Sequence, residues 1–212
     1  MPFTHTVSAA ELAALYRRPS ALVTNKSQPT IDTATAAFIG RSTFAIVSTS
    51  ASDGTLDASP RGGEPGFVQV IDEGRLAIAD LGGNNRLDSI RNLVDTGQIG
   101  VLFVVVGRTE TVRVNGTACL TTDPAILDAF PSSFRRPNAA IGIDVVETFI
   151  HCAKAFQRGR VWDADMRAAN ADVPDAIDIV LCQSLVEGDR AELRQLFDRG
   201  YAEDLADELP AR

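Results

Sequence analysis

Two loops of the sequence combine a basic side chain with small or amide residues, and this combination suits the binding of an anion. The first loop runs over residues 59–66 and reads SPRGGEPG. Its small residues, among them Ser59 and Gly62, let a ligand approach the backbone closely. Arg61 can form paired hydrogen bonds with a phosphate or with a carbonyl edge. The competing interpretation is a solvated arginine among turn glycines.

The second loop runs over residues 80–86 and reads DLGGNNR. It begins with Asp80 and leads into an expected helix. The first backbone amides of a helix, together with an arginine such as Arg86, form a ready anion site. The competing interpretation is simple capping of that helix by Asn84 or Asn85, with Arg86 in solvent.

A third polar group lies on an expected strand. Thr111, Arg113 and Asn115 alternate with Val112 and Val114, so the polar side chains share one face of the strand. That face is either a stripe that contacts a ligand or a solvated outer face, which is the commoner case in antiparallel sheets.

A fourth group follows His151. Lys154 and Arg158 are four residues apart, so both can reach one ligand from one face of a helix. His151 is expected one helical turn earlier, and Trp162 follows. The competing interpretation is an amphipathic surface helix with a buried tryptophan.

The sequence shows no pair of residues arranged as a catalytic nucleophile and its base. Ser59 is not inside a nucleophile elbow, and the adjacent His151 and Cys152 point in different directions. Two histidines and three widely spaced cysteines are too few for the usual zinc sites. The protein therefore either binds without reacting or takes its chemistry from a cofactor.

Charge and hydropathy narrow the class of partner. The formal net charge of -8 has the wrong sign for a protein that follows a nucleic-acid backbone. The longest apolar run, over residues 101–106, is far shorter than the roughly 20 residues that span a bilayer. The N-terminal residues lack the basic and apolar regions of a signal peptide. We therefore expect a cytoplasmic protein with reduced thiols that binds neither nucleic acid nor membrane.

The elements expected around these groups are mainly short strands joined by turns. A helix is expected from Thr30 or Asp32 to Gly40, another over residues 86–94, and most of the chain after His151 is expected to be helical. Strand patterns occur over residues 43–50, 56–59, 67–71, 76–79, 98–106, 110–117 and 141–150.

Short strands joined by turns favour an antiparallel barrel over a doubly wound parallel sheet. No strand is followed by GxGxxG, so no Rossmann nucleotide site is indicated. We expect an α+β protein with one barrel domain over residues 1–165, which includes the N-terminal helices. A helical C-terminal extension over residues 166–212 is expected to pack on the same domain.

Four segments in this order resemble one family. The stretches SPRGGEPGFVQV, ADLGGNNRLDSIRN, VLFVVVGRTETVRVNG and IHCAKAFQRGRVWD are similar to those of FMN-dependent flavoproteins related to pyridoxamine 5'-phosphate oxidase, and most similar to an uncharacterised bacterial subgroup. The resemblance covers residues 11–165. It implies a six-stranded antiparallel split β-barrel, to which the residue pattern adds peripheral helices and a helical C-terminal segment. It also implies a homodimer with FMN at the interface.

The resemblance further implies which residues contact the cofactor. Asn85 and Arg86 fall on the family's two basic phosphate contacts, and Asn85 replaces a charged residue there. The loop of Arg61 matches the segment that lines the isoalloxazine ring and the ribityl chain. Thr111 matches a polar position that hydrogen-bonds the flavin. The segment from His151 onward matches one contributed by the second subunit. The implied cofactor contacts are Ser59, Arg61, Gly62, Asp80, Asn84, Asn85, Arg86, Thr111, Arg113, His151, Lys154 and Trp162.

The chain departs from the oxidase itself. The lysine that binds the substrate phosphate there falls on Gln69, and the tryptophan and arginine motif of that enzyme has no match over residues 168–212. The vitamin B6 reaction is therefore not expected. The implied activity is that of an FMN-dependent oxidoreductase acting on an unidentified small substrate, aromatic or heterocyclic in character.

Two alternatives use the same barrel. One is a flavin-binding protein without turnover, which serves as a store or a redox sensor. The other is a deazaflavin-dependent reductase, because that cofactor makes similar demands on a site. Haem is disfavoured because the sequence has only two histidines.

Overall fold

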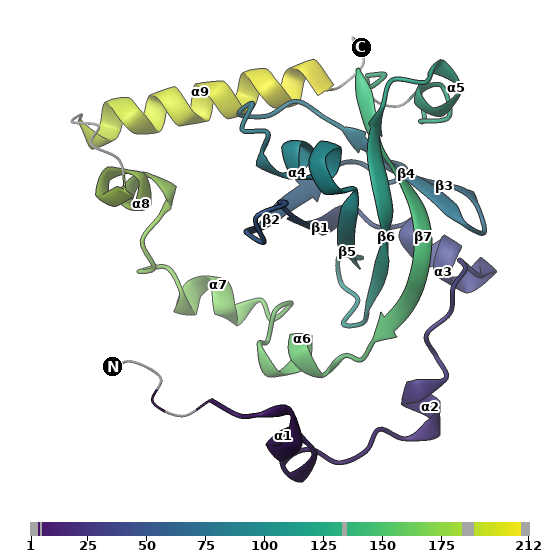
Figure 1. Ribbon diagram of the computed structural model, residues 1–212. Helices are drawn as coiled ribbons and strands as arrows, with labels where there is room; N and C mark the ends of the chain where they lie inside the picture. The colour runs from purple at the N-terminus through teal and green to yellow at the C-terminus, as the bar shows by residue number, and fades with distance from the viewer. Residues whose placement is uncertain (1–3, 5, 133–134, 184–188, 209–212) are drawn as a thin grey trace.

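The apolar runs in the middle of the chain form one antiparallel sheet (Figure 1). The computed structural model describes residues 4, 6–132, 135–183 and 189–208, and within them the sheet has seven strands in the order β2-β1-β5-β6-β7-β4-β3. The strands are β1 (Phe44–Ser50), β2 (Leu56–Gly62), β3 (Val68–Asp72), β4 (Arg75–Asp80), β5 (Gln98–Val104), β6 (Thr111–Thr121) and β7 (Ala139–His151).

The α+β class and the antiparallel pairing are confirmed, whereas the implied six-stranded barrel is corrected to a seven-stranded open sheet. Among the described residues the edge strands β2 and β3 do not pair with each other. The expected loop after Ser59 is also wrong, because β2 continues to Gly62, which lies opposite Phe44 of β1. Pro60 lacks a backbone N–H and is tolerated there because β2 is an edge strand.

Alternation along the central strands builds the core. Val47, Val101 and Val114 point to the same side of neighbouring strands and are at most 1% exposed. Helix α4 (Asp88–Thr96) packs Ile90 and Leu93 onto this side, while Val94 is exposed. The opposite side of β1, β5 and β6 carries the polar side chains of Thr111, Arg113 and Asn115. We call this side the outer face.

Helix α4 begins two residues later than expected, at Asp88 rather than Arg86. The reason is local, because Asn85 adopts a positive φ of 57° that interrupts the helical path before Arg86. The helix ends at Gly97, whose φ of 65° forms a left-handed cap. Side-chain hydrogen bonds from Asn92 to Thr49 and from Ser89 to Asp57 fix α4 beside β1 and β2.

Short helices precede the sheet. They are α1 (Ala9–Leu15), α2 (Ala21–Thr24) and α3 (Thr33–Ile39), and Asp32 caps α3 through the backbone N–H of Thr35. Between α2 and α3, the backbone of Gln28 pairs with that of Thr148 on β7. The N-terminal segment is thereby held along the free edge of the second half of β7.

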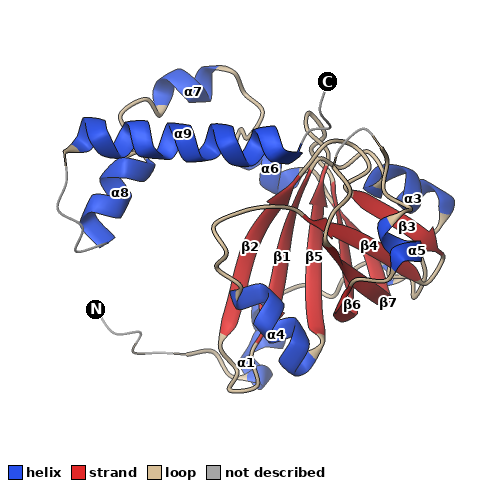
Figure 2. Ribbon diagram, turned by 90° about the horizontal axis from the view of Figure 1, so that it is seen from above, coloured by secondary structure: helices blue, strands red, loops and turns tan. Residues whose placement is uncertain are grey.

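The helices after β7 form an arm. They are α6 (Lys154–Arg158), α7 (Asp165–Ala169), α8 (Ala176–Gln183) and α9 (Arg190–Glu208), and α5 (Pro124–Leu127) lies between β6 and β7. Figure 1 shows the arm leaving the end of β7, and Figure 2 shows α7 to α9 standing to one side of the sheet. Among the described residues no helix combines the length and the apolar character needed to cross a membrane.

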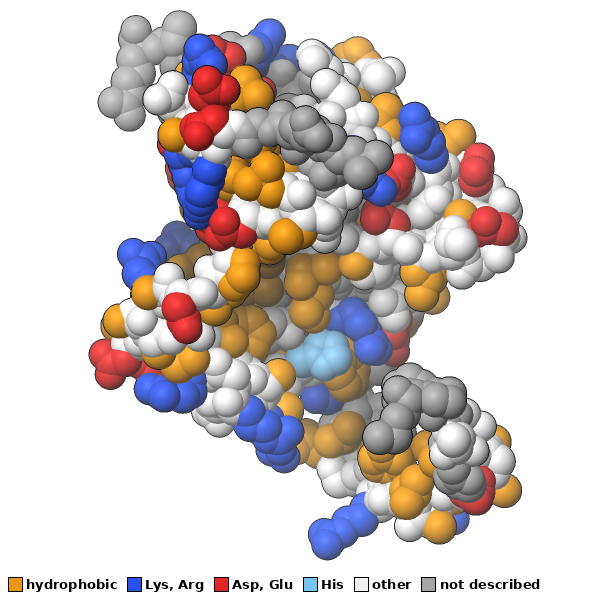
Figure 3. Space-filling view, turned by 90° about the vertical axis from the view of Figure 1, so that its left-hand side faces the viewer, with side chains coloured by type: hydrophobic (Ala, Val, Ile, Leu, Met, Phe, Trp, Pro, Cys, Tyr) orange, Lys and Arg blue, Asp and Glu red, His pale blue; other side chains and the backbone are white. Residues whose placement is uncertain are grey.

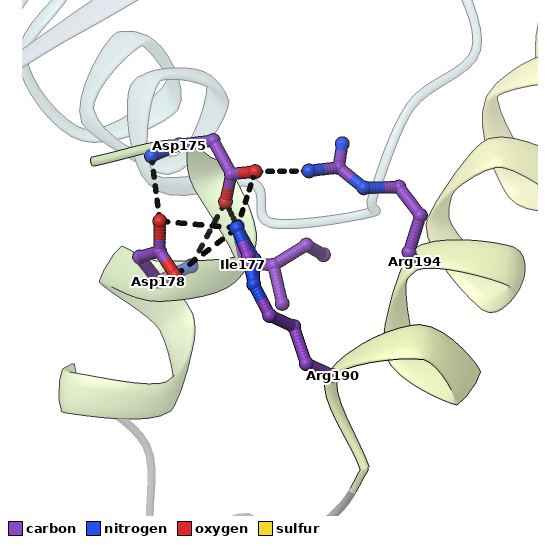
Figure 4. Close-up of polar contacts among 5 residues, drawn as sticks. All are labelled: Asp175, Ile177, Asp178, Arg190 and Arg194. Carbon is purple, nitrogen blue, oxygen red and sulfur yellow. Dashed lines mark hydrogen bonds and ion pairs between the residues drawn. The ribbon is translucent and has the colours of Figure 1, made fainter. Parts of the chain in front are cut away.

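Ion pairs fasten α8 to α9 (Figure 4). Arg190 lies 2.9 Å from Asp175 and 3.2 Å from Asp178, and Arg194 also pairs with Asp175. Ile177 is 1% exposed in the same hairpin. The division of the chain at residue 165 stays a prediction.

Candidate functional site

The two basic loops line one cavity. The cavity has a volume of about 500 Å³ and lies between the end of β2, the end of β4 and the loop before α4. Residues 59–62 and 80–86 are brought together although these strands share no hydrogen-bonded ladder. The expected contacts that line it are Ser59, Arg61, Gly62, Asp80, Asn84, Asn85 and Arg86.

Arg61 is the enclosed cation of this cavity, with a side chain that is 20% exposed. Its Nη1 donates to Asp80 Oδ1 at 2.9 Å. Its Nε is buried and has no hydrogen-bond partner among the described residues. A buried donor without a partner costs about 1–3 kcal/mol of free energy.

Arg86 is turned differently. Its side chain is 79% exposed, and its Nε lies 2.5 Å from Asp88 Oδ2. The hydrogen bond between them raises the pKa of Arg86 and lowers the pKa of Asp88. Asn84 accepts a hydrogen bond from the backbone N–H of Arg86 at 3.0 Å, so it forms a turn before the helix rather than capping the helix. The first cavity therefore has one enclosed cation and one at its margin.

A second cavity of about 350 Å³ lies on the outer face at the end of β7. Three of the expected contacts, Thr111, His151 and Lys154, line it together with Leu102, Cys152, Ala155, Phe156 and Arg158. His151 is the last residue of β7, so the expectation that it lies on the following helix is wrong.

Trp162 packs against Phe156, which lines the second cavity. Its ring centroid is 5.7 Å from that of Phe156, and its Nε1 donates to the carbonyl oxygen of Arg108 at 2.6 Å. The side chain is 40% exposed, so the alternative of a buried tryptophan is not borne out.

Arg113 lies on the outer face next to the second cavity. It donates to Glu147 at 2.9 Å, and Asn115 donates to the same carboxylate oxygen at 2.8 Å. The Ser27 hydroxyl donates to the other oxygen at 2.6 Å. The Ser27 hydrogen bond and the charge of Arg113 lower the pKa of Glu147. The Nε of Arg113 is buried without a partner among the described residues.

Phe149 contacts two cations on this face. Lys26 Nζ is 4.2 Å from the ring centroid and the Arg113 guanidinium carbon is 4.9 Å from it. His151 packs its edge against the same ring. Burial, and then the charges of Arg113 and Lys26, lower the pKa of His151.

Lys26, Glu147 and Phe149 are site residues that the sequence reasoning missed. Lys26 reaches the site because its Nζ donates to the Ile150 carbonyl and because Gln28 pairs with Thr148. No local sequence pattern predicts that Gln28 pairs with Thr148, because the two residues are 120 positions apart in the chain.

The structure therefore separates the expected contacts into two groups. One group lines the Arg61 cavity. In the other group, Thr111, His151 and Lys154 line the second cavity, and Arg113 and Trp162 contact its neighbours Phe149 and Phe156. Among the described residues, no cluster of three or more His, Cys, Asp and Glu side chains could hold a metal ion. The Arg61 cavity thus combines a guanidinium with loop backbone, which are hydrogen-bond donors of the kind that suit an anionic group.

The open antiparallel sheet and its flanking helices make this an α+β fold. The chain belongs to the pyridoxamine 5'-phosphate oxidase-like split-barrel family, whose model, described as Pyridoxamine 5'-phosphate oxidase, matches residues 31–152. The match covers both basic loops, the Arg113 strand and His151, so the family resemblance is confirmed.

Distant likenesses to solved structures accompany the family match. HupZ of Group A Streptococcus is 21% identical, with a TM-score of 0.46, covering 57% of this chain and 93% of that one. A putative pyridoxamine 5'-phosphate oxidase of Lactobacillus delbrueckii is 17% identical, with a TM-score of 0.45, covering 57% and 95% of the two chains. No curated protein matches the chain significantly. The family match alone carries the assignment.

Proposed function

We propose that the protein binds FMN and acts as an FMN-dependent oxidoreductase on a small aromatic or heterocyclic substrate. The observation that carries this proposal is Arg61, a guanidinium that is 20% exposed in a cavity lined by loop backbone and whose Nε has no hydrogen-bond partner in the part of the chain that the structure describes. The family consists mostly of flavin-dependent oxidoreductases, which supports the same assignment.

The residues of the Arg61 cavity fit a phosphate-bearing cofactor. Gly82 and Gly83 have no atom within 4 Å of the position a Cβ would take, so the loop leaves room for a ligand beside its backbone. Arg61, the amides of residues 82–86 and Arg86 would hold the phosphate, with Ser59 and Gly62 along the ribityl chain. When bound, FMN supplies hydride transfer at its N5 atom. The protein binds and orients it, and Arg61 adds positive charge.

A second copy of the chain would complete this site. Within one chain the contacts around His151 lie in a different cavity from those around Arg61. The outer face between them exposes apolar side chains, among them Phe44 at 38% and Ile46 at 36%. Packing of two such faces about a two-fold axis would bury them and bring the His151 cavity of one copy toward the Arg61 cavity of the other.

The test is the visible absorption spectrum of freshly purified protein, with the mass of any ligand released on denaturation and the molar mass in solution by light scattering. We expect the two flavin bands, the mass of FMN and a dimer. A colourless protein that does not take up added FMN would contradict the proposal. Release of a deazaflavin would show that the protein binds that cofactor instead of FMN. Reoxidation that does not depend on any added acceptor would favour a flavin store or sensor.

A further inference from the structure

The second cavity is lined by two cationic side chains that form no ion pair with the described residues. Lys154 and Arg158 line it one helical turn apart on α6, and neither has an ion-pair partner among the described residues. The next arginine, Arg160, is paired with Asp163 at 2.5 Å. None of the described residues that line the cavity is acidic. In a chain of net charge -8, this leaves a local excess of positive charge around one cavity.

The surroundings extend this excess. The Arg113 guanidinium carbon and Lys26 Nζ lie 4.9 Å and 4.2 Å from the Phe149 ring centroid, and Glu147 is the carboxylate that pairs with Arg113. His151 has a lowered pKa because of burial and of these two cations, so near neutral pH it is an uncharged hydrogen-bonding group in the cavity wall. Figure 3 shows basic and hydrophobic side chains gathered around a hollow on one face of the molecule.

The rest of the wall is apolar and suits a ring. Leu102 comes from β5, and Ala155 and Phe156 come from α6, where Phe156 is half-buried against Trp162. A volume of about 350 Å³ is at the lower end of cavities that hold small organic ligands. The wall thus offers an apolar surface for a planar body and cations for an acidic substituent.

We propose that the His151 cavity binds a small planar aromatic or heteroaromatic anion, whose carboxylate or phosphate is held by Lys154 and Arg158 and whose ring lies against Leu102 and Phe156. The binding itself follows from this cavity alone. The identification of the anion as the substrate rests on the proposed function, since the flavin would have to lie beside it.

Benzoate and benzamide form a matched pair of probes, because they share shape and differ in charge. Binding of each to the purified protein is measured by calorimetry at fixed ionic strength and by the fluorescence of Trp162, the single tryptophan of the chain. We expect benzoate to bind at least about tenfold more tightly than benzamide, as expected when a desolvated charge pair is formed. Phenyl phosphate in place of benzoate shows whether a carboxylate or a phosphate is preferred.

The variants Lys154→Met and Arg158→Met remove the charge and keep an unbranched apolar side chain. Each should bring the affinity for benzoate close to that for benzamide. Arg167→Met on α7 makes the same change of charge on an exposed arginine that does not line the cavity, and should leave the preference intact. Equal binding of the two probes, or a preference that persists in both cavity variants, overturns the proposal.

Flavin absorbance recorded in the same titrations separates this proposal from the proposed function. If benzoate expels bound FMN, the cavity belongs to the cofactor and the anion site is overturned. If the protein binds no flavin but still prefers benzoate at Trp162, the anion site stands and the proposed function fails.

Discussion

Arg61 and Asp80 form an ion pair, with 2.9 Å between Nη1 and Oδ1, that connects β2 to β4 on the side where the sheet does not close. Both side chains are about a quarter exposed or less, so the pair is only partly screened by water. Asp80 thus holds the Arg61 guanidinium at the cavity, where the side chain as a whole stays 20% exposed.

Arg61→Gln should weaken the binding of FMN. The loss of a hydrogen-bonded charge contact with a phosphate costs about 1.5–3 kcal/mol, which corresponds to about 10-fold to 100-fold in affinity. Titration of FMN followed by its fluorescence measures the change. Arg75→Gln is the control, because Arg75 pairs with Asp72 on an exposed turn outside the cavity. Unchanged affinity in Arg61→Gln would remove Arg61 from the phosphate site.

Arg113→Gln should raise the pKa of His151 toward its ordinary value of 6.5, because a neighbouring positive charge is removed. Because the pKa of His151 is lower in the folded protein than in the unfolded chain, protonation of His151 favours the unfolded chain. The stabilisation is present above pH 6.5 and is lost as the pH falls below it. Histidine NMR titration in a His5→Asn background gives a single resonance to follow. A titration that coincides with that of the parent would show that Arg113 does not influence His151.

Gly116→Ala should destabilise the protein by about 2–3 kcal/mol, because an added methyl group collides with the carbonyl oxygen of Asp144 at the β6–β7 register shift. Gly142→Ala is the matched control on β7, since its Cβ would meet nothing closer than Cys119 Sγ at 3.7 Å. Urea unfolding measures both variants. Similar midpoints for the two would contradict the predicted collision.

Asp175→Asn should release α9 from α8, because Asp175 accepts from both Arg190 and Arg194. Hydrogen bonds from the backbone, and then these arginines, lower the pKa of Asp175, so the ion pairs persist above its ordinary value of 3.8 and are lost as the pH falls through the folded pKa. Hydrogen exchange should accelerate across α9 while the sheet is unchanged. Asp172→Asn is the control, because this exposed neighbour should leave the hydrogen exchange of α9 unchanged. If α9 stays protected in Asp175→Asn, apolar contacts rather than ion pairs hold α8 and α9 together.

Much of this molecule is predictable from local pattern. The alternation in residues 110–117 places Val112 and Val114 in the core and Arg113 on the outer face, as the structure shows. The turn residues between strands predict antiparallel pairing, because short connections cannot cross a parallel sheet. The order of the four segments predicts the family, which the match over residues 31–152 confirms.

Local pattern fails where a boundary depends on the neighbouring strand. Pro60 and the glycines after it read as a loop, yet β2 continues to Gly62 because β1 offers a ladder and β2 has no partner on its other side. Similarly, the positive φ of Asn85 delays α4 to Asp88.

The sequence by itself determined the strand periods, the two basic loops and the family, because these depend on residue type over a few neighbouring positions. Only the tertiary structure decided that the sheet stays open, that Arg61 meets Asp80, that Lys26 reaches Phe149, and that the expected contacts separate into two cavities. These relationships join segments distant in the chain. They are set by how the curved sheet brings its strands together, which no short stretch of residues encodes.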